Sequence, residues 1–509
     1  MKSLVLDPAA VTLADLRAIA AGTVSVVLDE GAGERIAASL ALVQAVVDEG
    51  RTAYGVNTGF GKLAQTRISR EILAVLQENL ILSHCVGVGP HLGDDAVRLT
   101  LALKAMSLAR GHSGVRPETV AAILALLERR VMPAIPAKGS VGASGDLAPL
   151  AHMAATLIGV GEARFEGALM PARDALRMAG LAPVVLAPKE GLALINGTQV
   201  STALALVGLF GIENAFSAAL LAGVMSVDAV KGSDAPFDER IHALRGQSGQ
   251  IDVARAMRRC IAGSAIRASH VDCGKVQDPY SLRCQPQVMG AALDMIRHAA
   301  RILLTEAFAV TDNPLVFAAD GEILSGGNFH AEPVAMAADV LAIAASEIGA
   351  ISERRIALLT DPVMSGLPAF LVAEGGLNSG FMIAHVTAAA LASENKTLAH
   401  PASIDSLPTS ANQEDHVSMA TFGARRLTDI AANVAAIAGI EILAAAQGID
   451  FHRPHRSSEA LETAHGLIRG AVPFYERDRF FAPDIAAATR LVESGAFRSY
   501  CSELLPSAA

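Results

Sequence analysis

The 509-residue chain has no tryptophan, only 4% aromatic residues and only five cysteines, and each shortage narrows the class of protein. Because aromatic side chains are so few, the 52% hydrophobic content is mostly aliphatic and small, which favours closely packed helices over a β-sandwich. The cysteines are odd in number, scattered and without a CxxC pair, which is typical of reduced thiols in the cytoplasm. They are Cys85, Cys260, Cys273, Cys284 and Cys501.

Long runs of basic residues are also missing, and the formal net charge is −10. This balance argues against nucleic acid or an anionic membrane as the main partner. The longest uncharged run, 191–212, carries Asn196, Thr198 and Gln199 near its start, so it predicts a buried helix and no membrane span. The first residues show neither a sustained apolar run nor a cleavage-like site, so we expect no signal peptide and a cytoplasmic protein.

The N-terminal part mixes strand and helix signals. Residues 24–28 predict a short strand, and helical spacing follows in 36–47 and 72–80. Two hairpins are expected, one in 163–170 around Glu166-Gly167 and one in 315–324 around Asp320-Gly321.

Long helical patterns dominate the rest of the chain. In 332–353, apolar residues recur at steps of three and four, while polar residues seven apart follow the opposite face. That polar set is Glu332, Asp339, Ser346 and Glu353. We therefore expect a mainly α protein with an N-terminal mixed unit, 1–195, followed by a bundle of long helices, 196–509.

The most informative stretch is Gly139–Leu150, with the sequence Gly-Ser-Val-Gly-Ala-Ser-Gly-Asp-Leu-Ala-Pro-Leu. It fits a plain glycine-rich turn before a helix, whereas a serine-hydrolase elbow would need glycine in place of Asp146. A third chemistry is cyclisation, because the nitrogen of Gly145, unshielded by a Cβ, can approach the carbonyl of Ala143. Loss of water from Ser144 then leaves an electron-poor alkene on a five-membered ring, an electrophile that ordinary side chains do not supply.

This stretch resembles the cofactor loop of the aromatic amino acid ammonia-lyases, and other motifs of that family occur in order along nearly the whole chain. They are Tyr54–Gly61, Asn196–Gln199, Gln277–Arg283, Ser325–His330 and Asn412–His416. The resemblance implies an ammonia-lyase and fumarase-like architecture and a methylidene-imidazolone group formed autocatalytically from Ala143, Ser144 and Gly145. It also implies a homotetramer with active sites lined by more than one chain, and no dissociable cofactor.

The resemblance also assigns roles to single side chains. Tyr54 lies in a glycine-rich segment that suits a mobile lid, and it would remove the β-proton of the substrate. Arg283 would bind the substrate carboxylate, although an arginine is more often a structural ion-pair partner. Asn196 would hydrogen-bond the same carboxylate beside the electrophile, although helix capping would also account for it. The resemblance adds two polar side chains and one that packs near the substrate ring: Gln277, Tyr280 and Phe329.

Two pairs of residues would choose the substrate. Ser83-His84 and Gln413-Glu414 resemble the pairs in family members that act on histidine, and a histidine and a carboxylate can satisfy the two nitrogens of an imidazole. A phenyl ring would leave these groups unpaired, at a cost of ~1–3 kcal/mol each. The structural alternatives are an ordinary core or surface histidine and a glutamate near a helix start, since Ser410 and Gln413 fit a capping box. The expected reaction converts L-histidine to trans-urocanate and ammonia, the first step of histidine degradation.

The sequence disfavours most of the alternative functions. A tyrosine or phenylalanine ammonia-lyase is disfavoured by the two pairs just described, whereas an aminomutase, which re-adds the amine at the β-carbon, is not distinguished by the sequence. An inactive helical scaffold is disfavoured because Tyr54, Ser144 and Arg283 are intact. No metal site is expected, because His452-Arg453-Pro454-His455 is best interpreted as a polar loop and no H-E-x-x-H, P-loop or dinucleotide motif occurs.

Overall fold

The computed structural model describes residues 2–59, 65, 68–270 and 276–508 and divides the chain into two compact units. Unit 1 consists of Met1–Val207, Ala300–Asp339 and Pro401–Arg425. Unit 2 consists of Gly208–Ala299, Val340–His400 and Arg426–Ala509. Both units are thus assembled from separate stretches of the chain, and the expected division at residue 195 stays a prediction.

Unit 1 is the mixed part of the fold, and its strands form small sheets. The parallel pair is β1 (Lys2–Leu6) with β2 (Val24–Leu28), and the antiparallel sets are β3 (Val88–His91) with β5 (Pro136–Lys138), β4 (Met132–Pro133) with β6 (Glu162–Phe165) and β7 (Ala168–Pro171), and β8 (Leu315–Phe317) with β9 (Glu322–Leu324). The predicted strand at 24–28 and both predicted hairpins are therefore confirmed. Gly167 and Gly321 adopt φ values of 81° and 69° at the two turns, which explains the need for glycine there.

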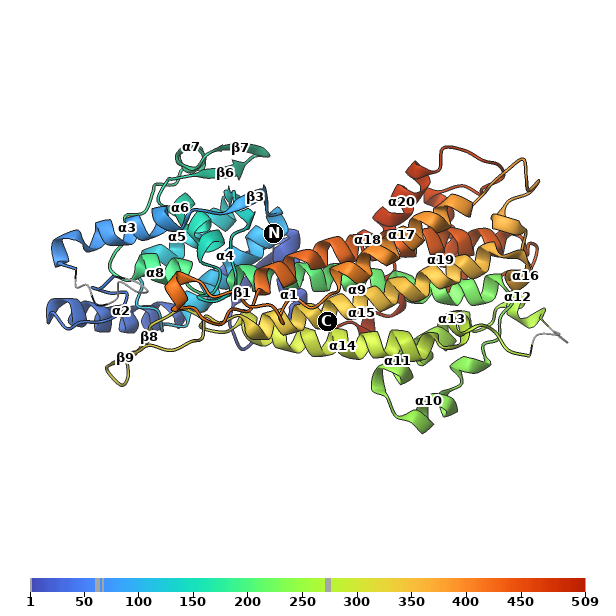
Figure 1. Cartoon of the computed structure of the whole chain (residues 1–509), viewed down its shortest axis with the longest axis horizontal. Helices are drawn as coiled ribbons and strands as arrows, with labels where there is room; N and C mark the ends of the chain where they lie inside the picture. Colours follow the sequence, from blue (N-terminus) through green and yellow to red (C-terminus); the bar gives the residue numbers. More distant parts are fainter. Residues whose placement is uncertain (1, 60–64, 66–67, 271–275, 509) are drawn as a thin grey trace. The chain divides into compact units, whose positions relative to one another are not determined.

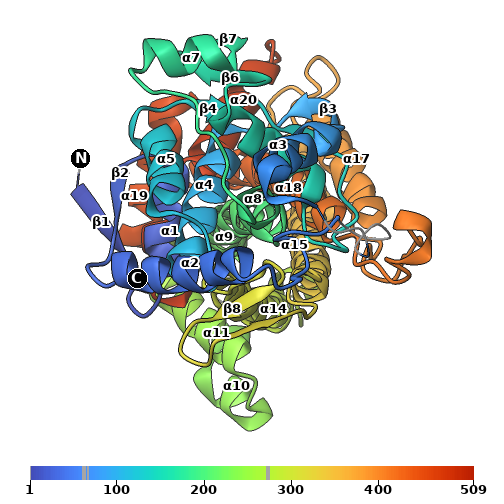
Figure 2. The same ribbon diagram turned by 90° about the vertical axis from the view of Figure 1, so that its left-hand side faces the viewer.

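The helices of unit 1 surround a buried central one. They are α1 (Leu13–Ala21), α2 (Ala32–Asp48), α3 (Leu73–His84), α4 (Asp94–Ala109), α5 (Pro117–Glu128), α6 (Leu147–Leu157), α7 (Ala172–Met178) and α8 (Glu190–Ile195), with the short 3-10 turns η2 (Arg70–Ile72) and η5 (Ser410–Asn412). In Figure 2, α4 lies among α1, α2 and α5, and it contacts all three. Because α4 is packed on every side, it is buried from Val97 to Ala109, apart from half-buried Arg98.

Unit 2 is a bundle of long helices, shown at the green-to-red end of Figure 1. Four described helices have one end in unit 1 and the rest in unit 2: α9 (Gln199–Ala229), α14 (Gln285–Ala307), α15 (Glu332–Thr360) and α18 (Ala420–Asp450). The other helices of unit 2 are α10 (Glu239–Arg245), α11 (Ser248–Ile261), α12 (Ala265–Ala268), α13 (Tyr280–Arg283), α16 (Pro362–Ser365), α17 (Met382–Leu398), α19 (Glu459–Ala471) and α20 (Ala482–Glu493). Short 3-10 turns complete it: η3 (Ala235–Phe237), η4 (Ala369–Leu371), η6 (Arg498–Tyr500) and η7 (Ser502–Leu504). The mainly α fold that the sequence predicts is confirmed.

A buried ion pair joins three of the long helices inside unit 2. Arg355 of α15 donates from Nε and Nη2 to the two carboxylate oxygens of Glu441 of α18, and Nη2 also donates to the carbonyl of Ala219 of α9 over 3.1 Å. Arg355 and Glu441 are both completely buried. Each charge therefore depends on the other, because a buried charge without its partner is strongly destabilising.

The polar face predicted for α15 is different in the structure. The apolar positions from Val334 to Ile351 are buried as predicted, but two members of the supposed polar face are buried as well. Asp339 accepts hydrogen bonds from the amides of Ala402 and Ser403, and Glu353 pairs with neighbouring basic side chains. The predicted helix is confirmed. Its polar residues need not face solvent, because a buried carboxylate can accept hydrogen bonds from protein donors.

Three of the described helices, α9, α15 and α18, are long and apolar enough to cross a membrane by length and composition alone. Their apolar 18-residue windows are buried inside the protein to 83%, 67% and 78%. Protein therefore covers most of these surfaces, as the expectation of buried helices requires.

Candidate active site

The segment Ala143–Gly145 lies in a loop directly before α6, and other parts of unit 1 hold this loop from two sides. Ser418 Oγ donates to the carbonyl of Gly142 over 2.9 Å. On the other side, the amide of Asp146 donates to the carbonyl of Gly197 over 2.8 Å. The path of the loop is therefore fixed by contacts with segments far away in the sequence.

Asp146 is the buried anchor of this loop. Its Oδ1 accepts from the hydroxyls of Ser140 and Thr421 over 3.0 and 2.5 Å, and its Oδ2 accepts from the amide and hydroxyl of Ser201 over 2.7 and 2.9 Å. From the sequence, Asp146 served only to disfavour a serine hydrolase, and its structural role was not predicted. The signal was present, because a carboxylate between a glycine-rich loop and an apolar helix must find donors when it is buried.

Two glycines of the loop cannot be replaced without movement. Gly142 and Gly145 have φ values of 66° and 70°, in the left-handed region that favours glycine. A Cβ on Gly142 would collide with Ser418 Oγ, and a Cβ on Gly145 would collide with the backbone of Gly197. The backbone of the loop is therefore packed more closely than any side chain would allow.

The loop forms one wall of a cavity of about 1240 Å³ that is lined by residues of unit 1. Eight of the site residues expected from the sequence line it: Tyr54, Ser83, His84, Ala143, Ser144, Asn196, Phe329 and Glu414. Residues to which the sequence assigned no role also line it, among them Asn79, Asn313, His330 and His416. The cavity thus collects motifs that are separated by more than 300 positions in the chain.

Asn196 lies at the end of α8, and its amide Nδ2 donates to the carbonyl of Ser144 over 2.6 Å. Its Oδ1 is buried and has no hydrogen-bond partner among the residues that the structure describes. The backbone carbonyl of Asn196 accepts from Nζ of Lys104 over 2.8 Å. Asn196 is therefore fixed from behind by Lys104 while its side chain contacts the loop.

Lys104 is completely buried in α4, and this burial lowers the pKa of its amine to about 7, although Asp312 and Asp146 act in the opposite direction. Nζ also donates to the carbonyl of Ala193 over 3.1 Å. The sequence did not predict that Lys104 is buried. Its ammonium group is accommodated by the carbonyls of Ala193 and Asn196, which come close to it only in the folded protein.

His84 ends α3, and its Nδ1 lies 2.8 Å from the carbonyl oxygen of Leu80. Because a carbonyl oxygen only accepts, Nδ1 carries the hydrogen, and Nε2 is an acceptor when the ring is neutral. Burial holds the pKa of His84 below its ordinary value, although the Leu80 carbonyl and the Glu414 carboxylate both act to raise it. The neutral ring is therefore the favoured form near neutral pH.

The carboxylate of Glu414 is held by two hydroxyls. Its Oε1 accepts from Ser144 Oγ and its Oε2 from Thr409 Oγ1, each over 2.5 Å. The structural alternative of a capping box does not hold, because Ser410 begins a 3-10 turn with left-handed residues and no α-helix starts there. Glu414 therefore contacts the loop directly instead of stabilising a helix start.

Tyr54 lies in a turn that borders the cavity. The amide of Gly55 donates to Thr58 Oγ1 over 3.2 Å, and Thr58 is buried. Gly55 has a φ of 69°, which fits a tight turn. The last two residues of this motif, Phe60 and Gly61, lie outside the described residues.

Gln277, Tyr280 and Arg283 belong to unit 2 and do not line this cavity. Gln277 and Tyr280 are exposed, and the guanidinium of Arg283 lies over the ring of Tyr280 at 4.5 Å from its centroid. Nε of Arg283 donates to the carbonyl of Asp278 over 3.0 Å. These side chains form a small group at α13, in which the half-buried guanidinium of Arg283 carries the positive charge.

The residues of the loop fit a methylidene-imidazolone group. Such a ring needs a residue without a Cβ at Gly145, and the structure leaves no room for one there. It also carries the Ser144 carbonyl as its ring carbonyl, and the amide of Asn196 already donates to that oxygen. The loop can therefore hold the group without changing its contacts at either end.

Known proteins resemble the chain over nearly its whole length. Residues 11–470 match the family described as aromatic amino acid lyase. A protein named histidine ammonia-lyase from Aromatoleum aromaticum is 63% identical over 98% of this chain and 95% of its own. The crystal structure of histidine ammonia-lyase from Trypanosoma cruzi is 42% identical with a TM-score of 0.91, covering 99% of this chain and 96% of that one. The structure of tyrosine aminomutase from Streptomyces globisporus is 34% identical with a TM-score of 0.92, covering 98% of each chain.

Proposed function

The chain belongs to the aromatic amino acid lyase family, and on this premise we propose that it eliminates ammonia from L-histidine to give trans-urocanate. The observation that supports this most directly is that Ser144, His84 and Glu414 line one cavity. His84 and Glu414 both present acceptors, so either can take the N–H of an imidazole ring. A phenyl ring offers no hydrogen-bond donor to them.

We propose that Ala143, Ser144 and Gly145 cyclise to a methylidene-imidazolone, which supplies an electrophilic carbon for elimination of the amine. The amide of Asn196, which donates to the carbonyl of Ser144, would withdraw electron density from the ring system. The loss of the Ser144 hydroxyl would also release Oε1 of Glu414 for a substrate donor.

Tyr54 would act as the base that removes the β-proton, since its phenol lies in the wall of the same cavity. Asn196 would bind the substrate carboxylate as well as the loop, because the second amide hydrogen on its Nδ2 is not used in the contact with Ser144 and can be donated to a carboxylate oxygen. Ser83 would support His84, whose Nδ1 lies 3.1 Å from Ser83 Oγ. Phe329 would pack against the ring of the substrate.

Arg283, Gln277 and Tyr280 would enter the cavity from other copies of the chain. Gln277 and Tyr280 are exposed in unit 2 and Arg283 is half-buried, so its guanidinium is still accessible to a carboxylate, which supports this. We therefore propose a homotetramer in which each active site uses more than one chain. An acidic chain without basic runs, in which the four described cysteines are free thiols, suits a cytoplasmic enzyme that binds neither nucleic acid nor membrane. Those cysteines are Cys85, Cys260, Cys284 and Cys501, while Cys273 lies outside the described residues.

The second candidate is an aminomutase, because a tyrosine aminomutase has the same fold at 34% identity. The two functions differ in their products, urocanate and ammonia in one case and a β-amino acid in the other. Incubation of the purified protein with L-histidine, followed by urocanate absorbance and chromatography of the amino acids, separates them. Conversion of L-tyrosine in preference to L-histidine would contradict the proposed substrate.

A further inference from the structure

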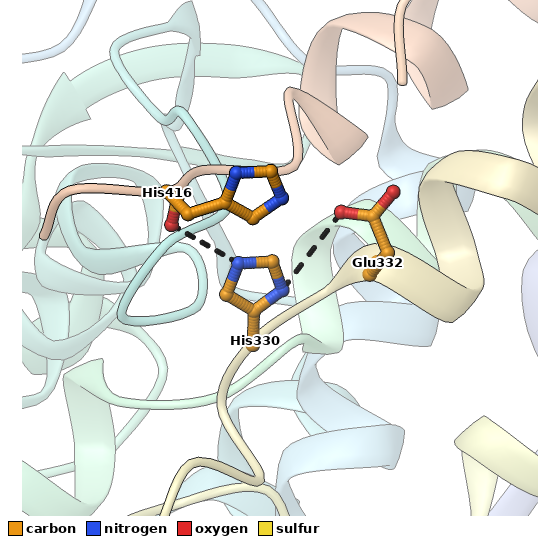
Figure 3. A group of neighbouring side chains, drawn as sticks. All are labelled: His330, Glu332 and His416. Carbon is orange, nitrogen blue, oxygen red and sulfur yellow. Dashed lines mark hydrogen bonds and ion pairs between the residues drawn. The ribbon is translucent and has the colours of Figure 1, made fainter. Parts of the chain in front are cut away.

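Three side chains lie close together, and two of them, His330 and His416, line the cavity. Glu332 begins α15, His330 lies two residues before it, and His416 lies in the loop after η5, all within unit 1 (Figure 3). One ligand atom of each lies within 4.8 Å of the others. The two imidazole rings are stacked, with centroids 5.7 Å apart and planes at 6°.

The hydrogen bond of His330 determines which of its nitrogens can bind a cation. Its Nε2 lies 3.1 Å from the backbone carbonyl oxygen of His416, and this oxygen only accepts. Nε2 therefore carries the hydrogen, and Nδ1 of the neutral ring presents a lone pair. Figure 3 shows this Nδ1 facing Oε2 of Glu332, at a distance of 4.0 Å.

Oε2 of Glu332 is shielded from solvent and has no hydrogen-bond partner among the residues described here. A shielded carboxylate oxygen without a donor is costly, and His330 Nδ1, which is also an acceptor, lies 4.0 Å from it. Two acceptors that face each other repel unless a cation lies between them. A bound cation would therefore satisfy both atoms.

We propose that His330, Glu332 and His416 bind one divalent transition-metal ion of the Zn²⁺ class. Two imidazoles and one carboxylate form a ligand set typical of Zn²⁺, and a metal-binding histidine usually donates its other ring N–H to a carbonyl or carboxylate, as His330 does. The hard ions Mg²⁺ and Ca²⁺ prefer oxygen ligands and are not expected here. The ligand atoms lie within 4.8 Å of one another and would move closer together on binding the ion.

The ion would act on the structure of the cavity wall. It would tie the start of α15 to the segment Ser410–His416, which carries Glu414. Ser410, Ala411 and Asn412 have φ values of 51°, 54° and 64°, in the left-handed region, which is strained for serine and alanine. A metal ligand at the end of this strained segment would hold Glu414 in the position that faces the loop.

The test uses the full-length protein without a polyhistidine tag, treated with a chelator, dialysed and kept free of L-histidine, which itself binds metals. Zn²⁺ and Co²⁺ are titrated separately, with bound metal per chain, the visible absorption of Co²⁺ and the melting temperature as measurements. Glu332→Gln and His416→Gln remove ligands from two different segments. His455→Gln removes an exposed histidine outside the cluster and serves as the matched control.

We expect about one Zn²⁺ per chain in the unchanged protein and in His455→Gln, with a higher melting temperature when Zn²⁺ is bound. Each ligand variant should bind Zn²⁺ more than about 10-fold more weakly. Replacing even a residue that only hydrogen-bonds a metal ligand typically lowers the metal affinity about 10- to 100-fold. Circular dichroism of each variant verifies that it is folded. Absence of stoichiometric binding in the unchanged protein would mean that the three side chains do not form a metal site, and equal binding by all variants would mean adventitious surface sites. Either result overturns the proposal, and neither affects the proposed lyase function, because no turnover is measured.

Discussion

The hydroxyl of Ser144 donates a hydrogen bond of 2.5 Å to Oε1 of Glu414. The proposed electrophile and the proposed ring-binding residue are therefore in direct contact before the loop matures. Dehydration of Ser144 would remove this hydroxyl and leave a carboxylate oxygen open to the cavity. The carboxylate oxygen Oε1 of Glu414 would thus become available to the substrate only after the electrophile has formed.

Ser144→Ala should fold normally and lose nearly all activity, because alanine has no hydroxyl to eliminate and no alkene can form. Intact-mass spectrometry checks this directly. The unchanged protein should be lighter than its sequence by two molecules of water, whereas the variant should not show the loss from its side chain. Ser494→Ala, at an exposed position, serves as the control and should keep both the mass loss and the activity. An active protein with the full sequence mass would contradict the cyclisation.

Glu414→Ala should reduce kcat/KM for L-histidine about 10- to 100-fold, because an imidazole N–H loses its acceptor. Any side activity on L-phenylalanine should fall much less, since a phenyl ring makes no such hydrogen bond. Because Glu414 also contacts Ser144, the mass of the variant must be measured first. Equal losses on both substrates in a fully matured variant would exclude a role in ring recognition.

His84→Phe should raise the ratio of kcat/KM for L-phenylalanine or L-tyrosine to that for L-histidine. The change replaces an acceptor in the cavity wall by an apolar ring and leaves the groups that bind the amine and carboxylate in place. Steady-state kinetics on the three substrates measure the ratio. An unchanged ratio would show that His84 does not contact the ring of the substrate.

Arg283→Ala and Ser144→Ala should each be inactive alone but should recover activity when their subunits are mixed. In a mixed oligomer, some sites would combine an intact Ser144 from one chain with an intact Arg283 from another. The two variants are denatured together, refolded and assayed, with each variant refolded alone as the control. If mixing restores nothing although light scattering shows mixed oligomers, all site residues must come from one chain.

Lys104 should make the free energy of unfolding depend on pH above neutrality. Its pKa is about 7 in the folded protein, against 10.5 for an ordinary lysine, so between these values the unfolded chain binds more protons. Stability from this group is therefore complete above about pH 10.5 and is lost as pH falls towards 7. Chemical denaturation at several pH values should show this slope in the unchanged protein and a smaller one in Lys104→Met. The same slope in both would show that Lys104 is not buried as described.

Short-range sequence signals predicted the local structure well. Asp320-Gly321 marked a hairpin because a left-handed turn needs glycine, and the apolar spacing of Val334–Ile351 marked a buried helix face. The capping box at Ser410 failed because that segment is shaped by contacts of Thr409 and Glu414 and not by a helix start.

Long-range relationships could not be predicted from the sequence by physical reasoning alone. The spacing of residues does not indicate that Asp146 accepts a hydrogen bond from Thr421. Nor does it indicate that Lys104 donates to the carbonyl of Asn196. The resemblance to a family supplied the candidate site residues, and its motifs include His330 and His416, but it assigned no role to either histidine. These two histidines lie on segments that only the folded unit 1 brings together.

Unit 1 is closed by Pro401–Arg425, a stretch that a ribosome adds after most of the chain has already been made. The loop at Ala143–Gly145 therefore cannot acquire its contacts with Ser418, Thr421 and Glu414 during early synthesis. Modification of the loop would have to follow release of nearly the full chain, so that prematurely terminated fragments carry no reactive group. The order of the segments would thus protect the cell from a free electrophile on an unfinished protein.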